Sequence, residues 1–423
     1  MSELQATPFV PGIARGVLRR ASTHKASDSI VVVAQHELKR FDPRPTGIVV
    51  VEGAPLSHPM IAVFGMGIPT IIVSGDMAAM LAEGSEAIID GARGTIIQPA
   101  RTLTTEMPVP PPPAVGKPVT TADGTEVVLR ASVSSREAAA RAIASGATGI
   151  GLVRSEFLTP EDGQRPDAIF YEHVLHELCE AAQPLPVTVR LPDIAPDKPV
   201  PWLQPVAGMS GPLGLQGARL YEHEPVRSVF HAMVDAVARL RDHHELSLLI
   251  PYLASCAEFR HWHDEIVQRL ADVSLPIGAM VETPAAVLEM PNWFDVADFV
   301  AIGCNDLMQC LFAADRDLPE LSFLLDPYAP SLLRFLRQAA EAAGNNIHKV
   351  QLCGLLPQLP GMLPVLLGMG FRAFSIEPVM VPYLAQVTRT ISMTQAVDLA
   401  QRVCAANDSR QVRQQLHSNA PKR

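Results

Sequence analysis

The sequence predicts an α/β protein in which a small β/α domain precedes a (β/α)8 barrel. Between residues 124 and 405, eight short strand-like runs alternate with helical stretches, which is the order of a parallel barrel surrounded by helices. The first 100 residues hold short β-like runs separated by Gly and Asp turns. A proline-rich segment separates the two regions, so we expect two domains joined by a linker.

The first domain, residues 1–100, contains one helix start that could carry chemistry. Its β-like runs are 30–33, 47–51, 70–73, 87–89 and 95–97, and a short helix is expected over 60–66. Pro59 suits the first helical position, which puts His58 at or beside the N-cap. A phosphoryl group on His58 would face free backbone N–H groups and the positive end of the helix dipole. The alternative is an ordinary surface histidine.

Residues 101–123 form the predicted linker. The run Met-Pro-Val-Pro-Pro-Pro-Pro at 107–113 excludes a helix and favours polyproline II, at roughly 3.1 Å per residue. A dozen such residues reach about 35 Å. That length would let the first domain swing between two positions, although a simple spacer has the same composition.

The barrel region, residues 124–405, is read from its eight strand-like runs. They are 126–131, 149–153, 187–190, 247–251, 277–281, 299–302, 350–353 and 373–376. In such a barrel the active site lies at the carboxyl ends of the strands. A helix over 394–402 is expected to lead into a polar, mobile tail, residues 406–423.

Two carboxylates follow directly on predicted strands. Glu282 comes after the run 277–281, and Asp306 comes shortly after the run 299–302. Neighbouring parallel strands could direct both side chains at one cation. A small number of hard oxygen ligands from the protein suits a Mg²⁺ ion that also binds a substrate phosphate. The alternative is a pair of solvated loop acids.

Four cations follow predicted strands in the same way. Arg154 follows the second run, Arg190 ends the third with Lys198 shortly after it, and Arg316 follows the sixth. Guanidinium groups match phosphate and carboxylate bidentately, so together these side chains could hold a small anion with two or three negative charges. Singly, each would be a structural ion-pair former.

Several motifs resemble one enzyme family. VETPAA at 281–286 and IGCNDLMQCLFAADR at 302–316 look like the metal and substrate loops of the phosphoenolpyruvate-utilising enzymes. This family includes pyruvate phosphate dikinase, phosphoenolpyruvate synthase and enzyme I of the bacterial sugar phosphotransferase system. The motifs look most similar to those of enzyme I. SHPMIAVFGMGIPTIIVSG at 57–75 resembles the phosphohistidine segment of the same family, so the similarity extends over nearly the whole chain.

The resemblance implies a fold and a set of roles. It implies a swivelling phosphohistidine domain carrying His58, followed by a phosphoenolpyruvate-binding barrel. It also implies Mg²⁺ on Glu282 and Asp306. Phosphoenolpyruvate would be bound at the mouth of the barrel. Its phosphate and carboxylate would be held by Asn305, Arg154, Arg190 and Arg316. The resemblance further implies that Cys353, at the end of the seventh strand, protonates C3 of the enolate to give pyruvate.

Four positions depart from the family pattern. Gln216 stands where enzyme I has a further substrate arginine, so it can hydrogen-bond an anion without bringing charge. Leu355 replaces a glutamate, and Ala54 and Leu56 replace a glycine and a threonine ahead of His58. These departures keep three alternatives open. They are a phosphoenolpyruvate-binding regulator without turnover, a synthase- or dikinase-type component that works with a separate nucleotide-binding chain, and a lyase acting on an enolate.

Composition limits the partners and the compartment. A net charge of −10 without a Lys/Arg block argues against nucleic acid or an anionic membrane. No run of 18 apolar residues and no signal-peptide pattern occurs, and six scattered cysteines fit reduced thiols, so we expect a cytoplasmic protein. We also expect a homodimer through the barrel. About 40 residues separate the segment 11–13 from Gly53, too few for the helical insert of enzyme I. The phosphoryl acceptor or donor is therefore expected to be a separate protein or a small molecule.

Overall fold

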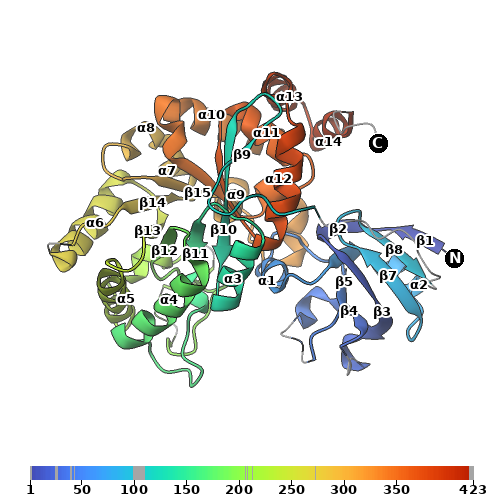
Figure 1. Cartoon of the computed structure of the whole chain (residues 1–423), viewed down its shortest axis with the longest axis horizontal. Helices are drawn as coiled ribbons and strands as arrows, with labels where there is room; N and C mark the ends of the chain where they lie inside the picture. The colour runs from blue at the N-terminus through green and yellow to red at the C-terminus, as the bar shows by residue number, and fades with distance from the viewer. Residues whose placement is uncertain are drawn as a thin grey trace. The chain divides into compact units, whose positions relative to one another are not determined.

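The computed structural model describes residues 2–23, 27–38, 41, 43–98, 110–204, 206, 208–211, 213–271 and 273–418. The chain divides into two compact units, Met1–Pro111 with Arg316–Pro319 and Pro112–Asp315 with Glu320–Arg423. The first unit is built on a mixed β-sheet, and the second contains a barrel of parallel strands (Figure 1).

In the sheet of the first unit, the described strands follow the order β1-β8-β7-β3-β4-β5-β6-β2. The neighbours β3–β4, β4–β5 and β5–β6 are parallel, and the remaining pairs are antiparallel. The elements are β1 Ser2–Gln5, β2 Thr7–Val10, β3 Ile13–Arg20, β4 Ser29–Ala34, β5 Gly47–Val51, α1 His58–Met66, β6 Thr70–Val73, α2 Gly75–Met80, β7 Glu86–Asp90 and β8 Thr95–Gln98.

The central strands of this sheet form because their side chains are apolar on both faces. Ile30 of β4, Val49 of β5 and Ile71 of β6 are fully buried in one cluster, as expected of parallel strands covered on both sides. Burial of each such side chain stabilises the fold by about 1.5–3 kcal/mol. All five predicted runs of the first domain lie in strands. The sequence does not predict β1, β2 and β3. For β3 the reason is that half-exposed residues interrupt its pattern and its pairing with β4 and β7 decides its conformation.

The barrel of the second unit is closed by eight parallel strands. Strands β10 to β17 pair in chain order, and β17 pairs with β10 to complete the ring. Each predicted barrel run coincides with a strand to within two residues at either end, so the barrel prediction is confirmed. The strands are β10 Glu126–Val133, β11 Ile150–Val153, β12 Val187–Arg190, β13 Leu246–Leu253, β14 Ile277–Val281, β15 Val300–Gly303, β16 Val350–Cys353 and β17 Ala373–Ile376.

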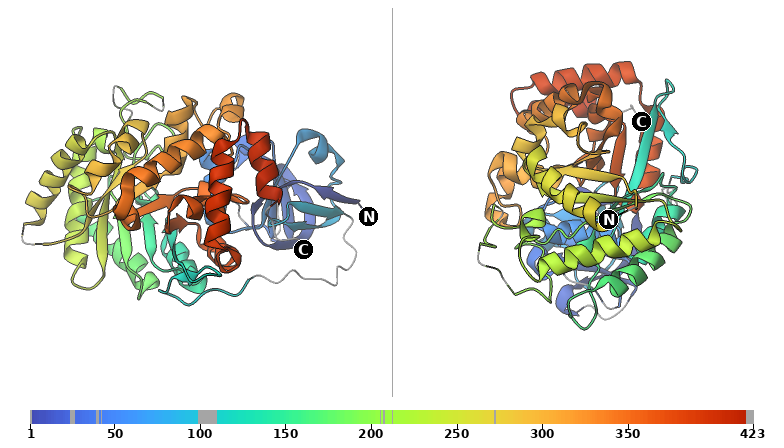
Figure 2. Two further views of the ribbon diagram at one scale, coloured as in Figure 1. Left: turned by 90° about the horizontal axis from the view of Figure 1, so that it is seen from above. Right: turned by 90° about the vertical axis from the view of Figure 1, so that its left-hand side faces the viewer.

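Helices lie around the outside of these strands (Figures 1 and 2). Each is amphipathic or short and apolar. In α5, for example, Val229, Phe230, Met233 and Val237 are all fully buried, at the spacing of one helix face. The helices are α3 Arg136–Ala144, α4 Ala168–Ala182, α5 Val226–Leu240, α6 Cys256–Leu270, α7 Pro284–Leu288, α8 Met290–Trp293, α9 Cys304–Phe312, α10 Pro330–Ala343, α11 Met362–Met369, α12 Val381–Thr390, α13 Met393–Ala405 and α14 Ser409–Ser418.

Two predicted segments differ from the structure. Within the predicted linker, residues 101–109 lie outside the described residues, but Val119–Thr120 forms strand β9, antiparallel to β10. The Ala122 amide also donates to Ile391, so the last part of this segment packs on the barrel. The predicted polar tail contains α14, in which Val412 is fully buried and Leu416 is 9% exposed. The prediction of a mobile tail is therefore wrong for α14, because two apolar residues one turn apart anchor it.

None of the helices in the described part of the chain has the length and apolar character required to span a bilayer.

Candidate active site

The barrel places most of the predicted site residues at one end. Arg154 follows β11, Arg190 ends β12, Glu282 follows β14 and Cys353 ends β16. Asp306 lies in the first turn of α9, which begins directly after β15. Because all eight strands run in the same direction around a closed ring, these positions share the carboxyl end of the barrel.

Glu282 is held rigidly at this end. Its side chain is buried, and its Oε1 accepts a hydrogen bond of 2.8 Å from the backbone amide of Tyr252. Its Oε2 has no hydrogen-bond donor among the residues that the structure describes. Gly303 allows this placement, because a Cβ there would lie 2.2 Å from Oε2.

The electrostatic environment of Glu282 suits a cation. Burial is the main cause that raises its pKa well above the usual value, and the carboxylates of Asp306 and Asp193 add to it. Arg190 and Lys198 act in the opposite direction without offsetting the rise. An acidic side chain of this kind, with one oxygen lacking a donor, fits a hard divalent cation. These properties suit Glu282 to the metal-ligand role predicted for it, with the carboxylate of Asp306 nearby, and the binding of one metal ion by both side chains stays a prediction.

Arg190 and Lys198 join one buried ion-pair network. Arg190 donates to Glu156, and its other terminal nitrogen lies 2.7 Å from Asp193. Lys198 also contacts Asp193 and lies 4.0 Å from Asp306. Burial opposes ionisation of Asp193, but Arg190 and Lys198 outweigh it and lower its pKa. Asp193 thus fixes both cations in place, and Glu156 gives Arg190 a second acidic partner.

Arg154 has one acidic partner of its own. Its guanidinium lies 2.7 Å from Glu377, which directly follows β17 and is 3% exposed. Burial raises the pKa of Glu377, and the ion pair with Arg154 partly offsets that rise. A guanidinium offers five N–H donors, so a carboxylate on one edge leaves room for a second anion on another.

Asn305 and Cys353 lie beside the carboxylates. The Oδ1 of Asn305 accepts from the amide of Leu355 at 3.1 Å, and Gly354 has a positive φ that brings its backbone against the Asn305 amide. Cys353 is buried in the barrel interior with Leu152, Leu249 and Met280. Burial raises the pKa of its thiol to about 12, with a smaller opposing effect of Arg190, so Cys353 is protonated at neutral pH.

Gln216 is brought to the same neighbourhood by the chain after Lys198. It is 3% exposed and directly precedes the 3₁₀ helix Gly217–Leu220. A Cβ on Gly217 would lie 2.6 Å from Tyr252 and 3.3 Å from Asp193. The backbone beside Gln216 is therefore packed against the residues that hold Glu282 and Arg190.

For two predicted site residues, His58 and Arg316, the position relative to this group stays a prediction. His58 is the first residue of α1, whose N-cap is Ser57, and its side chain lies outside what the structure describes. Pro59 therefore takes the second helical position instead of the predicted first one. Arg316 follows α9 in the chain. Its membership of the site remains a prediction, as does that of His58.

Sequence reasoning missed Asp193, Glu156, Glu377 and Tyr252. Glu377 could have been found, because it follows strand β17 as directly as Glu282 follows β14. Glu156 lies two residues after Arg154 and Asp193 three residues after Arg190, so both stand in segments at the ends of predicted strands. Tyr252 gave no such signal, because its contribution is a backbone amide and a positive φ of 53° near the end of β13.

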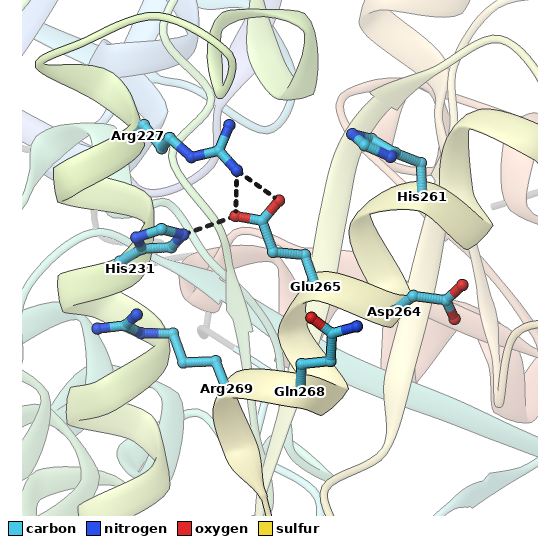
Figure 3. Close-up of a pocket in the computed structure, with 7 residues that line it drawn as sticks. All are labelled: Arg227, His231, His261, Asp264, Glu265, Gln268 and Arg269. Carbon is cyan, nitrogen blue, oxygen red and sulfur yellow. Dashed lines mark hydrogen bonds and ion pairs between the residues drawn. The ribbon is translucent and has the colours of Figure 1, made fainter.

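A separate groove of about 530 Å³ lies between α5 and α6 (Figure 3). Its charged side chains are largely paired with one another. Arg227 donates to both oxygens of Glu265 at 2.9 Å, His231 lies 2.6 Å from the same carboxylate, and Arg269 pairs with Asp235. This network joins two outer helices and is distinct from the carboxyl end of the barrel.

The fold and site together define a class. A closed (β/α)8 barrel with buried arginines, a lysine and acidic side chains at its carboxyl end is the arrangement of an enzyme for a small anion. Comparison with known families makes this specific. Residues 114–393 match the family described as "PEP-utilising enzyme, PEP-binding domain", and residues 28–94 match "PEP-utilising enzyme, mobile domain". The chain therefore belongs to the family of phosphoenolpyruvate-utilising enzymes.

Curated relatives agree with this assignment. The chain is 29% identical over 416 residues to a phosphoenolpyruvate-protein phosphotransferase of Haloferax volcanii, covering 93% of this chain and 73% of the relative. It is 30% identical over 381 residues to one of Streptomyces coelicolor, covering 87% and 67%. It is also 30% identical over 387 residues to a multiphosphoryl transfer protein of Xanthomonas campestris, covering 87% and 45%. The chain thus spans less than half of the last relative and about two thirds or more of the other two.

Proposed function

We propose that this chain is a phosphoenolpyruvate-dependent phosphotransferase that moves a phosphoryl group through His58 to or from a separate acceptor, with pyruvate as co-product. The observation that carries the proposal is the group of buried, oppositely charged side chains at the carboxyl end of the barrel, with Glu282 and Arg190 at its centre. The family assignment and the names of the relatives support the same reaction.

Binding of the substrate is assigned to the cationic side chains. Arg154, Arg190 and Arg316 would hold the phosphate and carboxylate of phosphoenolpyruvate, with Lys198 adding charge and Asn305 and Gln216 adding hydrogen bonds. Arg190 and Lys198 are fixed by Asp193 and Glu156 before any ligand arrives. The site therefore needs little rearrangement to accept the anion.

Glu282 and Asp306 would hold the Mg²⁺ on which the family depends. When bound, the ion would neutralise charge on the transferring phosphoryl group. The role of the protein is to supply two acidic ligands with fixed geometry, and Gly303 and the amide of Tyr252 provide this for Glu282.

The transfer step is assigned to His58. An imidazole nitrogen attacks phosphorus in line, the bond between phosphorus and the enol oxygen breaks, and the electron pair stays on that oxygen as an enolate. Cys353 then donates its proton to C3, giving pyruvate. Its pKa of about 12 keeps the thiol protonated, as a general acid requires. For this step the first unit, which we propose as the phosphohistidine domain, must bring His58 to the barrel.

Isotope exchange between pyruvate and phosphoenolpyruvate tests the proposal. Labelled pyruvate should enter phosphoenolpyruvate when Mg²⁺ is present, because the phosphohistidine half-reaction is reversible. His58→Ala should abolish the exchange, whereas His36→Ala, a histidine elsewhere in the first unit, should leave it unchanged. Exchange at the wild-type rate in His58→Ala would exclude His58 as the nucleophile.

A second candidate is a phosphoenolpyruvate-binding regulator without turnover. Gln216 and Leu355 favour it, because both are buried at the site and both are uncharged where the family carries charge. Such a protein would bind phosphoenolpyruvate and show no exchange.

We also propose that the protein is located in the cytoplasm and that it forms a homodimer through the barrel. Light scattering of the purified chain tests the dimer.

A further inference from the structure

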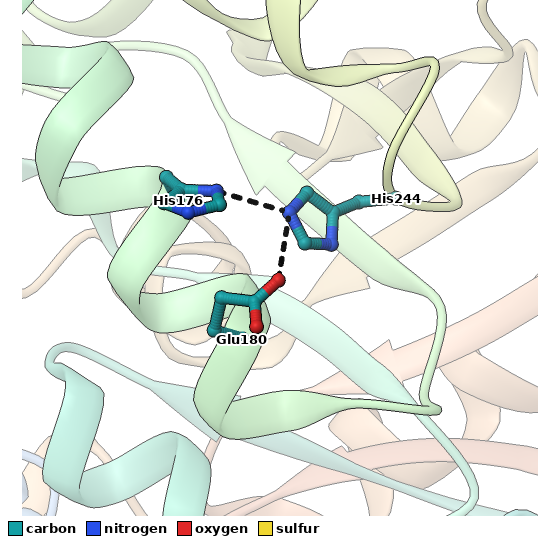
Figure 4. Close-up of side chains that lie close together, drawn as sticks. All are labelled: His176, Glu180 and His244. Atoms are coloured by element: carbon teal, nitrogen blue, oxygen red, sulfur yellow. Dashed lines mark hydrogen bonds and ion pairs between the residues drawn. The ribbon is translucent and has the colours of Figure 1, made fainter.

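Three potential metal ligands converge on the outside of the barrel, away from the active site (Figure 4). His176 and Glu180 lie one turn apart on α4, and His244 lies between α5 and β13, 68 residues from His176. The Nε2 of His244 is 3.3 Å from the Nδ1 of His176 and 3.7 Å from the Oε1 of Glu180. All three ligand atoms lie within 4.8 Å of one another.

The distance between the two histidine nitrogens matches that between two ligands of one tetrahedral ion. Zinc binds imidazole nitrogen at about 2.0–2.1 Å, so two nitrogens on a tetrahedral ion lie about 3.3–3.4 Å apart. The separation between His176 and His244 already has this value. Glu180 has rotatable bonds and an exposed end, so a small movement brings its oxygen to the same spacing.

The surroundings allow an ion to reach the three side chains. The imidazole of His244 is 3% exposed and therefore fixed by packing, whereas His176 and Glu180 are open to solvent.

We propose that His176, Glu180 and His244 form a binding site for one first-row transition ion of the Zn²⁺ type. Two imidazole nitrogens and one carboxylate oxygen would be the protein ligands, and water would complete the tetrahedron. Nitrogen ligands favour such an ion over Mg²⁺, so this site and the carboxylate site at Glu282 differ in the cation they select.

The position in the fold indicates a structural role for the ion. His244 lies just before β13, whose first residue, Leu246, pairs with Val187, the first residue of β12. The site is therefore at the amino end of the strands, opposite the active site. A bound ion would fasten α4 to the connection between α5 and β13, and it would stabilise the folded barrel through mass action.

Zinc titration of the untagged, metal-free protein in excess MgCl2 tests the site. Calorimetry should give one equivalent of Zn²⁺ bound at micromolar concentrations, with a rise in Tm. His176→Ala removes an exposed ligand, so the variant should fold and should bind Zn²⁺ at least about tenfold more weakly. His173→Ala is the matched control, since His173 and Glu177 form a similar pair on the same helix, 4.0 Å apart. This variant should bind like the wild type.

Three results would overturn the proposal. They are no micromolar binding of Zn²⁺ by the wild type, equal affinity in His176→Ala and wild type, and an equal loss in His173→Ala. In each case the contacts between His176, Glu180 and His244 would be an ordinary hydrogen bond and ion pair. Because the readouts are zinc affinity and Tm, they do not depend on the phosphotransfer proposal.

Discussion

Replacing Glu282 by glutamine should raise the stability of the metal-free protein and abolish its activity with metal. The amide keeps an oxygen that can accept from the backbone of Tyr252, so the local geometry is retained. What changes is the buried negative charge, which is close to the carboxylates of Asp306 and Asp193. The variant should therefore be more stable than the wild type without metal and inactive with it.

The upward shift in the pKa of Glu282 sets an upper limit on this gain in stability. Its folded-state pKa is raised above the usual 4.5, so the folded protein binds this proton more tightly than the unfolded chain does. The resulting cost to stability is absent below pH 4.5 and grows as the pH rises toward the folded pKa. At pH 7 it reaches at most about 3 kcal/mol, at 1.36 kcal/mol per pH unit. Glutamine, which cannot ionise, removes this cost.

Urea unfolding in EDTA at pH 7 and pH 4.5 measures the effect. Glu282→Gln should be the more stable protein at pH 7, and the difference should nearly vanish at pH 4.5. Adding MgCl2 should stabilise the wild type and leave the variant unchanged. Exchange of pyruvate into phosphoenolpyruvate should fall by more than tenfold in the variant, which corresponds to about 1.4 kcal/mol. A variant less stable at pH 7 than the wild type, or one with nearly full exchange activity, would refute the assignment.

Three further substitutions probe the neighbouring side chains. Arg154→Met leaves Glu377 buried without its partner, so stability measured by urea unfolding should fall by about 3–5 kcal/mol at pH 8. The loss should be smaller at pH 5, where Glu377 is protonated more easily. The double variant Arg154→Met/Glu377→Gln should recover most of the lost stability. Cys353→Ala should slow pyruvate formation by about 10²–10⁴-fold with phosphoenolpyruvate affinity nearly unchanged, and an equal loss of both would indicate a packing role. Gln216→Arg should tighten phosphoenolpyruvate binding roughly tenfold, since a charged hydrogen bond contributes about 1.5 kcal/mol or more; weaker binding in calorimetry would mean that the pocket is rebuilt for another ligand.

The barrel was predictable because its strands are short, largely apolar and separated by helices. The same pattern revealed Glu282 and Arg190, since a charged residue at the end of a buried strand has few structural explanations. The contacts that hold Glu282 in place were not predictable from the sequence. The amide of Tyr252 and the close approach of Gly303 depend on neighbouring strands and leave no local pattern.

Contacts between distant segments explain the remaining differences. Strand β3 is a strand because β4 and β7 pair with it, and α14 is anchored by Val412 and Leu416, two apolar residues in a polar stretch. His244 and His176 are 68 residues apart, and neither stands in a metal-binding motif. Such sites become visible only when the helices and loops are placed in space.

The site of phosphorylation tests the central claim most directly. The wild-type chain should be incubated with phosphoenolpyruvate labelled in its phosphate, with Mg²⁺, and the modified residue identified by mass spectrometry. We expect one acid-labile, base-stable phosphoryl group on His58 of the wild type, with one pyruvate released for each phosphoryl group bound. His58→Ala should carry no label. Equal labelling of His58→Ala would contradict the account, and so would phosphoenolpyruvate that binds to the wild type without leaving any label on the protein.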